Sequence, residues 1–112
     1  MFSDERQKEV YKLIENLEDN LVSIEDKRKI AEIIDSLDKG TEKQKLRFKT
    51  VYHLLPNLPV CLTLTAYGIL EGCSPNAIRS SIGMMRNRLI NRSTNDDIDC
   101  IKEINKRVEN QK

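Results

Sequence analysis

Residues 64–89 read LTAYGILEGCSPNAIRSSIGMMRNRL, and this stretch predicts two helices joined by a tight turn. Gly72 can adopt the positive φ that such a turn requires, and Gly68 lets the first helix lie close to the second. Ser74 is a favoured N-cap residue, and Pro75 follows it at the first helical position, where proline is enriched. Because the joining turn contains glycine, the stretch predicts a helix-turn-helix.

The second of these helices has two unlike faces. Its apolar residues recur at spacings of four, three and four, which predicts one buried stripe of Ile78, Ile82, Met85 and Leu89. The opposite face carries small or polar residues, with Arg79 and Arg86 beside them: Asn76, Ser80, Gly83 and Asn87. No carboxylate occurs between Ser74 and Arg92. A carboxylate there would repel phosphates, whereas Asn and Arg hydrogen-bond base edges, so this face predicts contact with DNA.

The segment GCSPNAIRSSIGMMRNRL resembles the turn and recognition helix of LuxR-type regulators and of sigma-factor DNA-binding regions. In those families a Gly, an apolar residue and a capping Ser precede an arginine-rich helix, with Val or Ile four residues after the Ser. The resemblance covers about residues 64–92 and implies a bacterial helix-turn-helix regulator of transcription. The segment also resembles, more loosely, the output domain of sporulation response regulators. Glu71 and Gly68 depart from the pattern, which has an aliphatic residue and Ala there.

The rest of the chain also predicts helices, and no alternating strand pattern is present. We expect helices near residues 4–20, 24–38, 42–55, 62–71, 75–91 and 95–108, which makes the fold all-α. Pro56 and Pro59 mark a joint between an N-terminal helical region, residues 1–55, and a helix-turn-helix region with a C-terminal helix, residues 60–112. The two regions are expected to form one compact domain, because 112 residues suit a single domain.

Apolar stripes indicate which helix faces are buried. Val10, Leu13, Ile14, Leu17 and Leu21 form the first, and the following two helices carry Ile24, Ile30, Ile33, Ile34 and Leu37, then Leu46, Val51, Tyr52, Leu54 and Leu55. The last helix has a narrow stripe of Ile98, Ile101, Ile104 and Val108 among many charges. We therefore expect it to be too charged for a central position and to mediate a homodimer.

Charge is divided along the chain although its net value is only +1. Residues 1–41 and 93–112 are acidic on balance, whereas residues 42–92 hold eight basic and two acidic side chains. A basic middle block is what a surface that binds phosphates requires. The chain shows neither a signal peptide nor an apolar run of membrane-spanning length, so we expect a cytoplasmic protein with no membrane contact.

The sequence gives little support for catalysis or for metal binding. The chain has three cysteines, Cys61, Cys73 and Cys100, which is an odd number and includes no CxxC pair. His53 is the only histidine. Reduced thiols in a core explain such cysteines better than a disulfide framework or a zinc site does. A Cys-His pair would have to join His53 to Cys61 or Cys73, and neither lies in a nucleophile turn. We expect no enzyme, no cofactor and no metal.

The prediction for function is a small transcriptional regulator that binds double-stranded DNA sequence-specifically. Base edges would be read by Asn76, Arg79, Ser80 and Asn87, and Ser74 begins the reading helix. Phosphates would be met by Lys45, Lys49, Arg86, Arg88 and Arg92. The alternative is a helical protein-interaction module, an adaptor or anti-factor that binds a component of the transcription machinery and reads no bases.

Overall fold

The computed structural model describes residues 4–54, 68–69 and 72–111, and every regular element in this part of the chain is helical. Five helices have defined bounds: α1 Asp4–Glu18, α2 Ile24–Ser36, α3 Glu42–Val51, α5 Pro75–Arg92 and α6 Asn95–Asn110. The all-α prediction is confirmed, and each of these helices lies within four residues of its expected bounds. The expected joint at Pro56–Pro59 and most of the helix expected at 62–71 lie outside the described residues, but Gly68 and Ile69 are helical.

Helices α2, α3, α5 and α6 begin at side-chain caps. The Ser23 hydroxyl accepts a hydrogen bond from the backbone N–H of Asp26, and Thr41 and Thr94 each begin a complete capping box. These caps satisfy backbone donors that a helix start leaves without an intrahelical partner. The local sequence therefore determines where these helices start.

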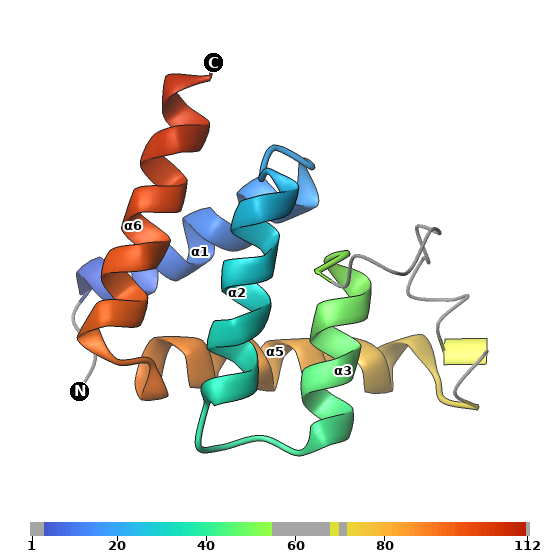
Figure 1. The fold of residues 1–112 in the computed structure, drawn as a ribbon. Helices are drawn as coiled ribbons and strands as arrows, with labels where there is room; N and C mark the ends of the chain where they lie inside the picture. Colours follow the sequence, from blue (N-terminus) through green and yellow to red (C-terminus); the bar gives the residue numbers. More distant parts are fainter. Residues whose placement is uncertain (1–3, 55–67, 70–71, 112) are drawn as a thin grey trace.

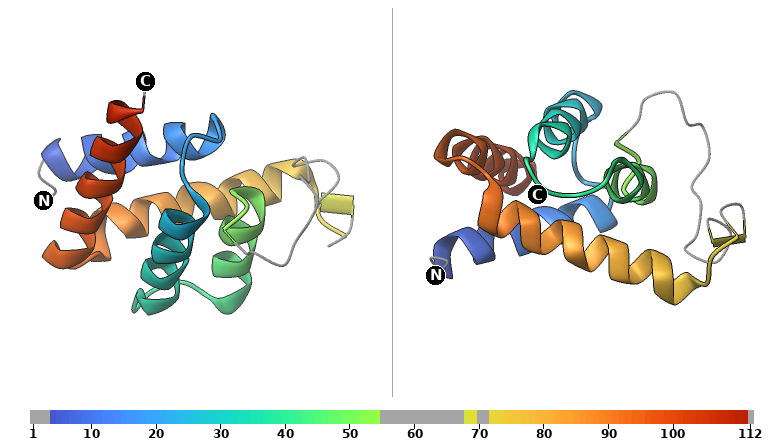
Figure 2. Two further views of the ribbon diagram at one scale, coloured as in Figure 1. Left: turned by 45° about the horizontal axis from the view of Figure 1, so that its top comes forward. Right: turned by 90° about the horizontal axis from the view of Figure 1, so that it is seen from below.

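The helices cross in two directions. Figures 1 and 2 show α6, α2 and α3 side by side, while α1 and α5 run across their direction. Within this arrangement α2 contacts both α3 and α6, while α5 packs against α1 and α3. As a result, one face of α5 is covered by α1 and α3, and its opposite face is left to solvent.

A single apolar core draws residues from all five helices. Its fully buried members include Leu13, Ile34, Phe48, Met85 and Leu89. Two residues expected in stripes are instead at the surface, because Ile24 begins α2 and is 68% exposed while Leu46 is 45% exposed. Phe48 takes the central place in α3 and packs on Tyr52, with ring centroids 4.8 Å apart.

The position of α6 corrects the expectation that this helix is too charged to be central. Ile98, Ile101, Ile104 and Val108 are all buried in the core of the same chain, where α6 packs along α1 and contacts α2. Asn105 is buried with them, and its Oδ1 accepts a hydrogen bond of 3.1 Å from Asn16 Nδ2 of α1. Since this stripe is already covered, it offers no apolar surface for a homodimer.

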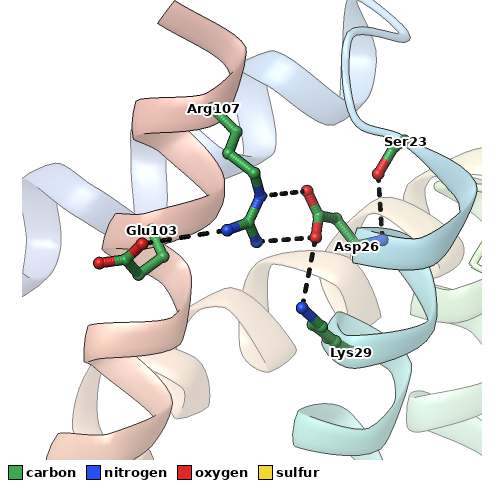
Figure 3. A network of polar contacts seen from close by, with 5 residues as sticks. All are labelled: Ser23, Asp26, Lys29, Glu103 and Arg107. Atoms are coloured by element: carbon green, nitrogen blue, oxygen red, sulfur yellow. Dashed lines mark hydrogen bonds and ion pairs between the residues drawn. The ribbon is translucent and has the colours of Figure 1, made fainter. Parts of the chain in front are cut away.

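An ion pair connects the start of α2 to α6 (Figure 3). Arg107 Nε and Nη2 donate to the two carboxylate oxygens of Asp26 at 3.0 and 2.8 Å. Asp26 is nearly buried, and the hydrogen bonds from Arg107 hold the pKa of its carboxyl below the ordinary value. Lys29 and Glu103 extend the network at 3.8 and 3.9 Å. The pair fixes α2 against α6 in the first turn of α2, where the positive end of the helix dipole also favours a carboxylate.

Candidate nucleic-acid interface

The turn before α5 depends on two glycines. Gly72 has a φ of +71°, its N–H donates to the Ile69 carbonyl at 3.2 Å, and the Cys73 N–H donates to the Gly68 carbonyl at 2.7 Å. These two bonds form a Schellman motif, which ends a helix with a residue in the left-handed region. A Cβ on Gly68 would lie 2.5 Å from the Cys73 carbonyl oxygen. Gly72 therefore adopts the positive φ expected of it, whereas the close approach of Gly68 is to the backbone of the turn residues Cys73 and Ser74.

Helix α5 starts where the sequence predicts. Ser74 is the N-cap with an extended backbone, and its hydroxyl accepts a hydrogen bond from the Ala77 N–H at 3.2 Å. Pro75 occupies the first helical position, where its missing N–H is not needed. Together with the Schellman motif, this cap fixes the direction in which α5 leaves the turn.

The inward face of α5 agrees with the predicted stripe at three of four positions. Ile78, Met85 and Leu89 are fully buried. Ile82 is only half-buried and packs against the edge of the core, which corrects the expectation that it is buried. Ser81 and Ile90 are buried as well, so the covered face is wider than the apolar stripe.

The outward face of α5 holds the side chains expected to read bases. Asn76, Ser80 and Asn87 are exposed, and Gly83 between them is half-buried. Met84, which the sequence analysis did not single out, is 45% exposed on the same side. The face thus carries uncharged residues around the apolar Met84, with no carboxylate from Ser74 to Arg92.

The four arginines of α5 point in different directions. Arg79 and Arg92 are exposed, and Arg79 makes one long contact of 3.5 Å to Asn76 Oδ1. Arg88 is half-buried and donates to Gln44 Oε1 of α3. Arg86 is also half-buried and lies over the Tyr11 ring of α1, 5.0 Å from the ring centroid. Among the four, Arg86 and Arg88 therefore contact side chains of other described helices, whereas Arg79 and Arg92 are exposed.

The two lysines expected at phosphates lie elsewhere. Lys45 is 7% exposed, and its ammonium donates to the backbone carbonyls of Leu37 and Asp35 at 2.9 and 3.3 Å. It therefore satisfies the C-terminal end of α2, where a cation is favoured, and does not face a ligand. Lys49 is half-buried and forms an ion pair of 2.6 Å with Asp35. Neither lysine belongs to the outward face of α5.

Two arginines hold α5 in place, and neither was predicted as a site residue. Arg47 of α3 donates to Ser81 Oγ at 2.7 Å and to Cys73 Sγ at 3.3 Å, so it joins α3 to both the turn and the helix. Arg6 of α1 donates to the carbonyls of Ile90 and Ser93 at the other end of α5. No sequence pattern distinguishes these two arginines from solvated ones, because their partners are distant in the chain.

The described residues give no geometry for metal chemistry. No group of three or more His, Cys, Asp or Glu side chains that could hold a metal ion occurs in this part of the chain. Cys73 and Cys100 are half-buried, whereas Cys61 lies outside the described residues. Burial raises the pKa of the Cys100 thiol, which makes it a weaker nucleophile. No described helix is long and apolar enough to cross a membrane.

Comparison with known proteins gives no match: no family model fits the chain, and no curated protein or solved structure is significantly similar to it.

Proposed function

We propose that this chain is a small sequence-specific DNA-binding regulator of transcription in which α5 is the recognition helix. The observation that carries the proposal is the outward face of α5, where Asn76, Ser80 and Asn87 are exposed without a carboxylate. Asn side chains hydrogen-bond adenine, and Ser bonds to several base edges. Arg79, near the N-terminal end of the same helix, is the residue for guanine O6 and N7.

Phosphate contacts in this proposal come from fewer residues than the charge of the middle block suggests. Arg92 is exposed at the end of α5, where a recognition helix leaves the groove. Arg86, Arg88 and Lys49 would have to leave contacts within the chain, and Lys45 is buried. A single module with so few phosphate contacts binds weakly, so we propose a two-fold dimer on DNA. Its contact surface is not the buried stripe of α6.

The experiment is selection from a random duplex library, followed by sequencing of the bound fraction and a salt titration on the enriched and random duplexes. A regulator enriches one motif, and its affinity for random DNA falls with salt by about one unit of log–log slope for each phosphate neutralised. Absence of both enrichment and salt-dependent binding would contradict the proposal.

The second candidate is the protein-interaction module, an adaptor that binds a transcription component. It is favoured by the engagement of Lys49, Arg86 and Arg88 within the chain and by the exposed Met84 on the outward face. Methionine is over-used on adaptable protein-binding surfaces. In this case random duplex DNA gives almost no binding, while substitutions on the outward face disrupt a protein complex.

A further inference from the structure

A surface cavity of about 610 Å³ lies between the C-terminal ends of α1 and α3 and the middle of α5. This volume falls within the range of small-molecule sites. Leu17, Val51 and Ile82 supply apolar walls from the three helices, and Gly83 supplies a stretch of wall without a side chain. Of the residues proposed to read bases, Arg79 is the one that lines this cavity.

Two guanidinium groups from α5 line the cavity, those of Arg79 and Arg86. Neither forms an ion pair with a residue that the structure describes. Arg86 is held in place over Tyr11, and its Nε is buried without a hydrogen-bond acceptor among the described residues. A partly buried guanidinium without an ion pair is costly, so a ligand carboxylate that pairs with its terminal nitrogens would stabilise this site.

The cavity keeps a positive charge although Glu18 is among its lining residues. Burial raises the pKa of Tyr52 to about 12, so its hydroxyl stays protonated at neutral pH. That hydroxyl donates to Glu18 Oε1 at 3.4 Å. Two guanidinium groups and one hydrogen-bonded carboxylate leave a net charge of +1 at the cavity, which favours an anion.

We propose that this cavity binds a small monocarboxylate with an apolar body. The carboxylate would accept hydrogen bonds from Arg86 and Arg79, because guanidinium groups pair with carboxylates in a planar geometry. The apolar body would lie against Leu17, Val51 and Ile82. The inference goes beyond the proposed function and is tested without DNA, so either can fail while the other holds.

The test is an NMR titration of ¹⁵N-labelled protein with octanoate, and with acetate and 1-octanol as probes that lack the apolar body or the charge. Octanoate is expected to shift the amide signals of His53, Ile82 and Gly83 in a saturable manner. Acetate and octanol should bind roughly tenfold more weakly, because each loses one kind of contact. Equal binding of octanoate and octanol, or octanoate shifts confined to residues away from the cavity, would overturn the proposal.

Two variants and one control complete the test. A Cβ on Gly83 meets no atom within 4 Å, so Gly83→Leu is accommodated in the helix and fills part of the cavity. Gly83→Leu should abolish octanoate binding, and Arg86→Met should weaken it roughly tenfold by removing the guanidinium. Gly83→Ala is the control and should retain most of the affinity. Full octanoate binding by a folded Gly83→Leu protein would also overturn the proposal.

Discussion

Gly72 and Gly83 both lack neighbours where a Cβ would be placed, but their backbones differ. Gly72 has a φ of +71°, whereas Gly83 lies inside α5. Gly72→Ala should therefore lower the free energy of unfolding by about 1 kcal/mol, since an alanine is strained in the left-handed region. Gly83→Ala should raise it by about 0.5–1 kcal/mol through helix propensity.

Urea denaturation of the two glycine variants measures both changes against the same wild type. Because neither substitution creates a contact, the opposite signs isolate backbone conformation from packing. Equal effects of the same sign would mean that the turn before α5 is not held in the conformation described here.

Arg79 and Arg92 are both exposed on α5 but are assigned different contacts. Arg79→Ala should weaken binding to the selected site and leave binding to random DNA nearly unchanged, because it removes a base contact worth about 1–3 kcal/mol. Arg92→Ala should weaken both about equally and reduce the salt slope by about one unit. Fluorescence anisotropy measures the affinity of each variant for the selected duplex and for the random duplex. The same ratio of these two affinities in Arg79→Ala and Arg92→Ala would contradict the assignment.

Within α5, the depth of burial separates two residues of the predicted stripe. Met85 is fully buried, so Met85→Ala should cost about 2–5 kcal/mol by leaving a cavity in the core. Ile82 is half-buried at the edge of the surface cavity, and Ile82→Ala should cost only about 1 kcal/mol. Urea midpoints measure both, and an Ile82 variant that is the less stable of the two would show that the inward face is misassigned.

At the junction of α2 and α6, the ion pair of Asp26 and Arg107 makes stability depend on pH. The folded pKa of Asp26 lies below its unfolded value of about 3.9, so its contribution is complete above that value and is lost as pH falls through the folded pKa. At neutral pH, Asp26→Asn should cost about 1–3 kcal/mol. Urea denaturation below pH 4 should show the difference from wild type narrowing.

Glu103→Gln is the control for this pH dependence. Its carboxylate lies 3.9 Å from Arg107 and its side chain is 65% exposed, so the substitution should change stability little at any pH. A gap between wild type and Asp26→Asn that stays constant from neutral to acidic pH would show that the Asp26 charge does not contribute.

For the described part of the molecule as a whole, local sequence signals predicted the five helices with defined bounds and the positive φ of Gly72 before α5. Ser74, Pro75 and Gly72 act on their immediate neighbours, so their effects can be read without a fold. The role of Lys45 could not be predicted from the sequence, because the carbonyls at the end of α2 that accept its hydrogen bonds come close to it only when α2 and α3 pack. For the same reason the apolar stripe of α6 could be found from its spacing, but its burial against α1 and α2 of the same chain could not.

The candidate site was predictable to a similar extent. The 3.6-residue period of α5 identified its outward residues, since burial of Ile78 and Leu89 leaves Asn76, Ser80 and Asn87 on the other side. The direction of each arginine was not predictable, because long side chains reach partners on other helices. Arg86 and Arg88 have such partners in α1 and α3.

The most direct measurement for the central claim is duplex DNA binding by Ser80→Glu, which places a carboxylate in the middle of the outward face. Ser80 is exposed, so the variant should keep the circular dichroism spectrum and urea midpoint of the wild type while losing DNA binding by fluorescence anisotropy. Gln7→Glu makes the same charge change at an exposed position of α1, and this variant should bind DNA as the wild type does. A folded Ser80→Glu protein that binds DNA with wild-type affinity would contradict the claim that α5 reads DNA.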